Sequence, residues 1–256
     1  MPQAGASSGY WQGSRMIRKN RYFWISALGV LSLGSGCVRH EWTLADVDHR
    51  MAIAVAPALN HSGSQDFDPL RLADLMASEL AQWPGVRVIP LNRVLAQLAA
   101  ENKERIESPA HALQVMERVG ADGIVVFAVT EYDPYHPPVM GLTAQLYGIG
   151  PERAGGFDPV AASRQSSPFE GGAYSKLPRA EYHRVFNSSD EAVQREIRRF
   201  ALRRNAEDSP YGWRKFVASQ ENFWRFCCAV TTRELIRQEV TQVVALRERQ
   251  NEVEQP

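Results

Sequence analysis

Residues 51–57 read Met-Ala-Ile-Ala-Val-Ala-Pro, and residues 123–130 read Gly-Ile-Val-Val-Phe-Ala-Val-Thr. Both runs are apolar at consecutive positions, which is typical of strands that are buried on both faces of a sheet. Strands of this kind occur mainly in parallel sheets that helices cover from both sides. The two runs therefore predict an α/β domain.

The chain between these runs alternates helix and strand signals. Asp68 followed by Pro69 fits the start of a helix, because aspartate caps the free N–H groups and proline suits the first helical position. Residues 86–90 predict a second strand, and residues 91–99 and 108–120 predict two further helices. Strands joined by crossover helices run parallel, so we expect the first three strands to be parallel.

A fourth strand is expected at residues 139–149, where apolar residues alternate loosely after a short connection, and this strand is expected to run antiparallel. The predicted fold is an α/β, three-layer domain over residues 51–150, with a mixed, mostly parallel sheet of about four strands flanked by helices. The rest of the chain is expected to divide into a signal peptide (1–36), a tether (37–50), a Gly/Pro/Ser-rich loop (151–187), a C-terminal helical region (188–250) and a frayed tail (251–256).

The N-terminal segment has the layout of a bacterial lipoprotein signal. Four basic residues precede the apolar run from Tyr22 to Leu33, and small residues then lead to Cys37. The run is shorter than the roughly 20 residues that span a bilayer, which favours a removable signal peptide over a membrane-spanning helix. We therefore expect cleavage after Gly36 and lipid on Cys37, with Met16 as an alternative start of the chain.

Three alternatives to lipidation remain open. The leucine of a lipobox usually stands three residues before the cysteine, whereas here Gly34 holds that position and Leu33 precedes it. Ordinary secretion with cleavage after Gly36, an uncleaved anchor and a cytoplasmic protein are therefore the alternatives. Val38 follows the cysteine, and in the lipoproteins that this segment resembles such a residue allows transfer to the outer membrane. The expected location is the cell envelope, with the protein facing the periplasm and held by lipid in the outer membrane.

Charge and composition narrow the classes of partner. The chain has 29 basic and 29 acidic residues, and removal of residues 1–36 leaves 25 basic and 29 acidic residues, a formal charge of −4. A nucleic-acid-binding protein usually has a basic excess, so no nucleic-acid partner is expected. Charged residues make up 23% and hydrophobic residues 44% of the chain, which is an ordinary globular mixture.

The residues that commonly bind metals or catalyse reactions form no recognisable motif. The six histidines include no HExxH pair, and no nucleophile elbow, phosphate-binding loop or dinucleotide-binding loop occurs. We expect no metal, no cofactor and no enzymatic activity. Besides Cys37 the chain has only Cys227 and Cys228, which we interpret as two small buried apolar side chains; a redox or intersubunit role is the alternative.

The best candidate for a partner or ligand surface is formed by Glu131, Tyr132, Asp133, Tyr135 and His136. These residues follow the third expected strand, and open α/β sheets commonly bind ligands beyond the carboxyl ends of their strands. Tyrosines also suit protein contacts. Three interpretations stay open: a proline-stiffened turn whose tyrosines pack on the core, a surface that binds a protein or small ligand, and a hydrolase site that uses Glu131, Asp133 and His136.

Three segments of the expected domain resemble a group of bacterial envelope proteins. They are Ile53–Pro57 with the turn at Asn60–Gly63, the strand and helix over Val86–Leu98, and Val119–Phe127, in which an alanine–aspartate pair enters a strand. The group includes the curli-secretion lipoprotein CsgG, the penicillin-binding-protein activator LpoB and the amino-terminal domain of TolB. The resemblance implies an envelope lipoprotein whose α/β domain docks other proteins.

The expected function is therefore that of a membrane-anchored, non-catalytic module for protein interaction or assembly. Its partners would be the membrane, through lipid on Cys37, and either an envelope protein of unknown identity or a second copy of the chain. A small-ligand-binding envelope protein and the hydrolase described above are the alternatives.

Overall fold

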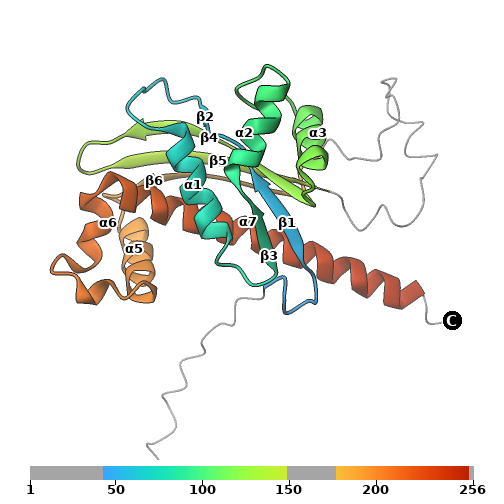
Figure 1. Ribbon diagram of the computed structural model, residues 1–256. Helices are drawn as coiled ribbons and strands as arrows, with labels where there is room; N and C mark the ends of the chain where they lie inside the picture. Colours follow the sequence, from blue (N-terminus) through green and yellow to red (C-terminus); the bar gives the residue numbers. More distant parts are fainter. Residues whose placement is uncertain (1–42, 149–176, 254–256) are drawn as a thin grey trace, which may run out of the picture. The chain divides into compact units, whose positions relative to one another are not determined.

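The computed structural model describes residues 43–148 and 177–253, and its centre is a six-stranded sheet (Figure 1). The strands are β1 (Met51–Val55), β2 (Leu59–Asn60), β3 (Val86–Ile89), β4 (Gly123–Asp133), β5 (Val139–Gly148) and β6 (Ala180–Asn187). Their order is β3-β1-β4-β5-β6, and β2 pairs with β4. β1 is parallel to β3 and β4, whereas β5 is antiparallel to β4 and β6. The predicted mixed α/β sheet is confirmed.

Helices cover both faces of this sheet. The helices are α1 (Pro69–Leu80), α2 (Leu91–Ala100), α3 (Pro109–Val119), α5 (Glu191–Arg203), α6 (Lys215–Ala218) and α7 (Gln220–Val253), with short 3-10 turns η2 (Ala206–Asp208) and η3 (Gly212–Arg214). α1, α5 and α7 share one buried cluster with the sheet, and α2 and α3 share a second cluster with its other face. This arrangement confirms the three layers.

The helix boundaries follow from local sequence chemistry. The Asp68 carboxylate accepts hydrogen bonds from the N–H groups of residues 70 and 71, and Pro69 occupies the first helical position of α1. Ser108 caps α3 in the same way. Gly120 ends α3 with φ +70°, a left-handed conformation that only glycine adopts without strain. These predicted starts and stops are confirmed.

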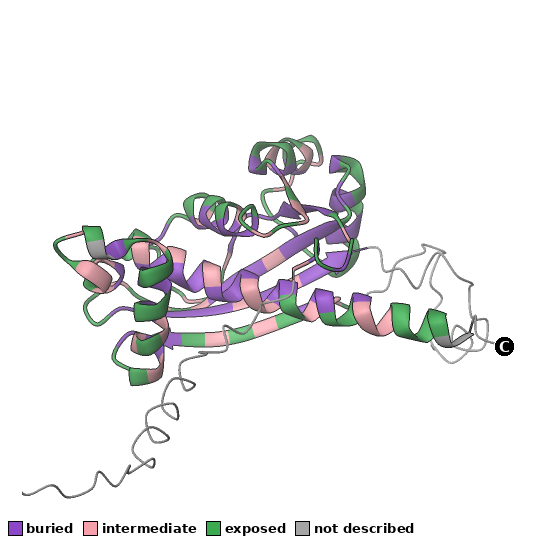
Figure 2. Ribbon diagram, turned by 90° about the horizontal axis from the view of Figure 1, so that it is seen from below, coloured by how far each residue is buried: buried purple, intermediate pink, exposed green. Residues whose placement is uncertain are grey.

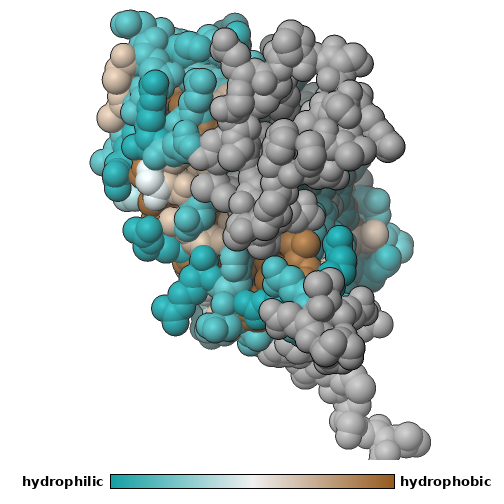
Figure 3. All heavy atoms as spheres, turned by 90° about the vertical axis from the view of Figure 1, so that its right-hand side faces the viewer, coloured by the Kyte–Doolittle hydropathy of each residue, from teal (hydrophilic) through white to brown (hydrophobic). Residues whose placement is uncertain are grey.

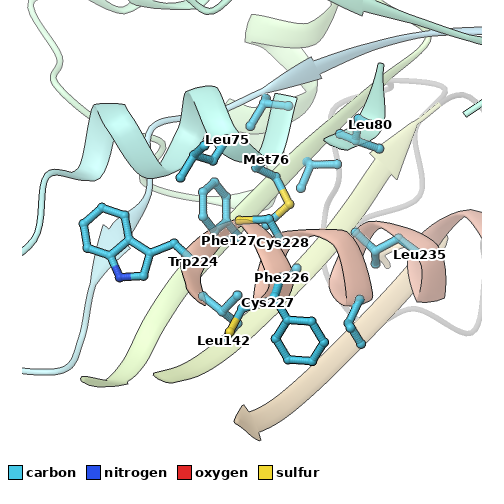
Figure 4. Packing of buried hydrophobic residues seen from close by; sticks show 14 of the residues in the cluster. Leu75, Met76, Leu80, Phe127, Leu142, Trp224, Phe226, Cys227, Cys228 and Leu235 are labelled. Atoms are coloured by element: carbon cyan, nitrogen blue, oxygen red, sulfur yellow. The ribbon is translucent and has the colours of Figure 1, made fainter. Parts of the chain in front are cut away.

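The larger buried cluster lies between α1, α7 and the sheet (Figure 4). α1 contributes Leu75 and Met76, the sheet contributes Phe127 and Leu142, and α7 crosses them with Phe226 and its neighbours. α7 is buried along its first half and exposed along its last turns, as Figure 2 shows. The C-terminal helical region is therefore part of the same core as the α/β sheet.

β2 and β6 were not expected. β6 lies in the segment interpreted as a loop over residues 151–187, and it runs along β5 as an edge strand. Ala180 and Phe186 are buried on one face, whereas Glu181, His183 and Val185 are exposed on the other. The strand has a polar face because it is covered on one side only, so it lacks the continuous apolar run that marks β1 and β4. Residues 149–176 lie outside the described part of the chain.

The segment before β1 is a docked turn where a tether was expected. Leu44 and Val47 are buried, at 0% and 7% exposure. Gly85 lies directly beneath this turn with φ +88°, and a Cβ there would approach the Ala45 nitrogen to 2.7 Å and the His49 oxygen to 2.8 Å. The glycine is needed because the turn packs against it. Residues 1–42, including the expected signal peptide, Gly36 and Cys37, lie outside the described residues.

α7 reaches Val253, beyond the predicted end of the helix at residue 250. Its last described turns extend past the sheet (Figure 1). The face on that side is mostly hydrophilic where it is described (Figure 3). Within residues 43–148 and 177–253, no helix combines the length and apolar character that crossing a bilayer would require.

Candidate functional site at the β4–β5 hairpin

The residues singled out from the sequence lie at the end of the β4–β5 hairpin. Glu131, Tyr132 and Asp133 are the last residues of β4, and Tyr135 and His136 stand in the turn before β5. The pairing with β5 shifts between Val129 and Glu131, where a β-bulge interrupts the ladder. We call residues 131–139 the hairpin tip.

Tyr132 belongs to the core. Its ring lies 5.3 Å from that of Phe67 and 6.0 Å from that of Trp224, and its hydroxyl is hydrogen-bonded to the Gln220 side chain. Burial raises the pKa of Tyr132 to about 12, so the phenol stays protonated at neutral pH. For this residue the structure agrees with the interpretation of a tyrosine packed on the core.

The other four residues are exposed. Tyr135 is 76% exposed, and its N–H donates to the Asp133 carboxylate at 3.0 Å. Glu131 and Asp133 share the sheet face opposite Tyr132, because side chains alternate along a strand. His136 lines a groove next to α5 and α6. Among the described residues, no hydrogen bond joins Glu131 or Asp133 to His136, whereas acid–base cooperation needs groups within hydrogen-bond reach.

A groove of about 520 Å³ separates the hairpin tip from the C-terminal helices. We call it the hairpin groove, and it is lined by His136, Pro137, Ser188, Ser189, Gln194, Trp213, Arg214, Val217 and Ala218. The segments that form it are the hairpin turn, the β6–α5 junction, η3 and α6. Hydrogen bonds fix the junction, since the Ser188 N–H donates to the Pro138 carbonyl at 3.1 Å and the Gln194 side chain donates to the Ser188 carbonyl at 3.0 Å.

The walls of the hairpin groove are positively charged. His136 and Arg214 are its only ionisable lining residues. The guanidinium groups of Arg198 and Arg214 lie 4.7 Å and 5.4 Å from the centre of the Trp213 ring, as in cation–π contacts. Among the described residues, no carboxylate forms an ion pair with either arginine. The sequence did not reveal this site because its residues come from three separate stretches of the chain, residues 136–137, 188–194 and 213–218.

The sheet face that carries Glu131 and Asp133 continues across β5 and β6. α2 and α3 pack on β1, β4 and the far end of β5, and no described helix covers the rest of this face. Polar side chains pair across the strands there, with 2.7 Å between Thr143 Oγ1 and His183 Nδ1 and 3.1 Å between Gln145 Nε2 and Glu181 Oε1. These pairs suit a surface in contact with water.

Two buried carboxylates join elements that are distant in the sequence. Glu239 of α7 is 0% exposed, and its carboxylate accepts hydrogen bonds from Nε and from a terminal nitrogen of Arg179. Glu79 of α1 is 2% exposed and pairs with Arg204 and Arg225. Burial raises the pKa of Glu79 although both arginines oppose that shift. We interpret both pairs as structural, because each joins elements that are distant in sequence.

Cys227 and Cys228 are free and fully buried, as expected. Their side chains point in different directions, Cys228 toward Met76 of α1 and Cys227 toward Leu142 of β5 (Figure 4). Burial raises the pKa of both thiols, which disfavours the reactive thiolate. In the part of the chain that the structure describes, no group of three or more His, Cys, Asp or Glu residues could hold a metal ion.

No family model matches the sequence, and no curated protein matches it. Several solved structures are similar. Lipoprotein GNA1162 from Neisseria meningitidis is 14% identical with a TM-score of 0.39, over 62% of this chain and 98% of that chain. The LpoB C-terminal domain from Escherichia coli is 11% identical with a TM-score of 0.32, over 38% of this chain and 71% of that chain. LpoB is one of the proteins that the sequence segments resemble.

A third similar structure is the PelC dodecamer from Paraburkholderia phytofirmans, which is 18% identical with a TM-score of 0.26, over 43% of this chain and 64% of that chain. At these identities and TM-scores, the activities and assemblies of the matched proteins are not transferred to this chain.

Proposed function

We propose that this chain is a lipid-anchored lipoprotein of the cell envelope that acts as a non-catalytic docking module. The lipid would be carried by Cys37, the protein would face the periplasm from the outer membrane, and the hairpin tip would contact an envelope protein. The observation that carries the proposal is the exposed hairpin tip beside a groove built from three separate segments.

The hairpin tip has the features of a protein contact surface. Tyr135 presents a large, mostly exposed aromatic ring, and aromatic residues are enriched in protein interfaces. The groove beside it adds a half-buried tryptophan, which is a common anchor for a partner. The strands beneath are held by the β5 ladder and by the core around Tyr132, so the tip is a rigid platform for binding.

The anchor is tested with the full chain and a Cys37→Ser variant. Intact mass and membrane fractionation should show a wild-type chain that begins at Cys37, carries added acyl mass and sediments with membranes. The Cys37→Ser chain should lack the acyl mass. A soluble wild-type chain with an unmodified Cys37 thiol would contradict lipid anchoring, and a chain that keeps residues 16–36 would contradict cleavage.

Docking is tested by crosslinking in cells that produce the protein, followed by purification under denaturing conditions. Tyr135→Asp should abolish the main crosslinked complex, because a carboxylate replaces the exposed ring. The matched control is Leu177→Asp, which changes a side chain of similar exposure, 75%, at the opposite end of the β5–β6 pair. Equal yields of the complex from wild type and Tyr135→Asp would contradict docking at the hairpin tip.

A further inference from the structure

We propose that the hairpin groove binds an acidic segment of the partner protein, with an aspartate or glutamate side chain of that segment facing Arg214 and His136. This inference rests on the proposed docking function and adds the chemistry of the partner. Small apolar side chains of the same segment would lie against Trp213, Val217 and Ala218.

The charge of the groove favours a carboxylate. Arg214 is exposed and lines the groove, and the only interaction described for its guanidinium is with the Trp213 ring. Arg198 lies on the same ring and also lacks an ion pair among the described residues. Two unpaired guanidinium groups beside one indole attract anions, and a guanidinium matches a carboxylate through paired hydrogen bonds.

The acidic groups near the groove are already engaged or point elsewhere. Asp190 and Glu191 follow Ser189 at the start of α5, and neither lines the groove. The Asp190 carboxylate accepts from the Ala192 N–H at 2.7 Å, and Glu191 lies 3.5 Å from Arg195. Among the residues described as lining the groove, no carboxylate therefore neutralises the positive charge of Arg214.

The Ser188 side chain adds a second polar feature to the groove. Ser188 is 4% exposed and lines the groove, and its hydroxyl makes no hydrogen bond to any described residue. A carboxylate in the groove could accept a hydrogen bond from this hydroxyl, which water would otherwise satisfy.

A protein segment fits the dimensions of the groove. The volume of about 520 Å³ accommodates several side chains. Apolar residues form the wall of the groove next to α6, which suits a chain with alternating acidic and small residues. The −4 charge expected for the processed chain disfavours long anionic polymers such as nucleic acids, which need a basic excess over a wide surface.

The test uses fluorescence anisotropy with the full chain in mild detergent and two labelled, terminally blocked peptides. One peptide alternates alanine and glutamate over nine residues, and the other alternates alanine and glutamine. We expect saturable binding of the glutamate peptide and binding at least about tenfold weaker for the glutamine peptide, because only the former carries charges complementary to the groove. Added salt should weaken the glutamate peptide only.

Variants locate the binding site. Arg214→Glu should weaken binding of the glutamate peptide by about tenfold or more, whereas Arg214→Lys keeps the charge but loses the paired hydrogen bonds and should weaken binding less than Arg214→Glu. Ser189→Glu adds a negative charge to the groove at the start of α5, where acids are compatible with helix stability, and should also weaken binding. The control is Arg195→Glu, because Arg195 is exposed on α5 outside the groove lining.

Three results would overturn the inference: no saturable binding of the glutamate peptide, equal binding of the two peptides, or unchanged binding in both Arg214→Glu and Ser189→Glu. The docking function can be judged separately from the crosslinks of the hairpin tip. A crosslinked partner segment without acidic residues would end the acidic-segment inference and leave docking intact. If the wild-type chain forms no crosslink, or if every crosslink persists in Tyr135→Asp, both the docking function and the acidic-segment inference end.

Discussion

Asp122 has a structural role in the segment Val119–Phe127, one of the three segments that resemble envelope proteins. Asp122 stands just before β4, and its carboxylate accepts the N–H of Ala52 in β1 at 2.7 Å. The Asp122 N–H donates to the Ala52 carbonyl at 2.7 Å in return. The aspartate of the alanine–aspartate pair therefore joins the starts of two neighbouring parallel strands, which is a structural role.

Gly85 gives the sharpest test of the docked N-terminal turn. Gly85→Ala should lower the free energy of unfolding by more than about 2 kcal/mol, because the new methyl group would meet backbone atoms of the turn in addition to the strain of a positive φ. Urea unfolding measures the change.

Gly63→Ala is the matched control for Gly85→Ala. Gly63 also has a positive φ, +76°, but a Cβ there meets nothing within 4 Å. Gly63→Ala should therefore lower the free energy of unfolding by only about 1–2 kcal/mol, the cost of a left-handed backbone at a residue with a Cβ. Equal losses at the two glycines would mean that the turn is not packed on Gly85.

Breaking the buried ion pair between Arg179 and Glu239 of α7 should lower the free energy of unfolding far more than breaking an exposed ion pair of α7. Glu239→Gln should lower the free energy of unfolding by about 3–5 kcal/mol, because it leaves the Arg179 charge buried without its partner. Glu234→Gln removes the more exposed pair with Arg237 and should cost less than about 1 kcal/mol. Similar losses in urea unfolding would contradict the burial of the first pair.

Glu79 should make stability depend on pH in an unusual direction. Its pKa in the folded protein is raised above the ordinary value of 4.5, so the folded state binds the proton more tightly than the unfolded state. The free energy of unfolding of the wild type, relative to Glu79→Gln, should therefore decrease as the pH rises above 4.5. Urea unfolding of both proteins at several pH values measures this difference. An increase over the same range would mean that Arg204 and Arg225 outweigh the cost of burial.

Helices and strands differ in how well their sequences predict them. β1 and β4 are buried on both faces and carry continuous apolar runs, and α1 and α3 carry capping residues, so their positions could be read directly. β6 is covered on one face and its exposed face is polar, so its sequence has no continuous apolar run. It also adjoins a glycine-rich segment, and for both reasons the strand was not predicted. Residues 43–50 form a packed turn within the expected tether, and the sequence did not predict it because two buried side chains in a short turn have no periodicity.

The edge of β6 is protected by side chains of α7. The Gln238 amide accepts from the Glu181 N–H at 3.0 Å and donates to the Glu181 carbonyl at 2.9 Å, as a neighbouring strand would. Gln238→Ala should speed hydrogen exchange of the Glu181 amide by about fivefold or more, since a net hydrogen bond is worth about 1 kcal/mol. Gln242→Ala removes a bond to the Arg179 carbonyl only and should leave that amide unchanged. No acceleration in Gln238→Ala would contradict this protection.

The chain as a whole places its candidate docking surface where distant segments meet. The hairpin tip was predicted from the sequence, since it follows a buried strand and is rich in tyrosine. The hairpin groove was not, because Trp213, Arg214 and Ser188 become neighbours of His136 only when α5, α6 and α7 fold back onto the sheet. Tyr132 was included in the expected surface because strand alternation could not be read through the bulge after Val129.

The most direct test of docking at the hairpin tip is site-specific photo-crosslinking in intact cells, with photoreactive benzoylphenylalanine replacing Tyr135 in one full chain and Leu177 in another. Both positions are highly exposed, at 76% and 75%, but they lie at opposite ends of the β4–β5–β6 sheet. The proposed function predicts one reproducible envelope-protein adduct from position 135, in the membrane fraction, and none from position 177. Identical adducts from both positions, or none from position 135, would contradict it.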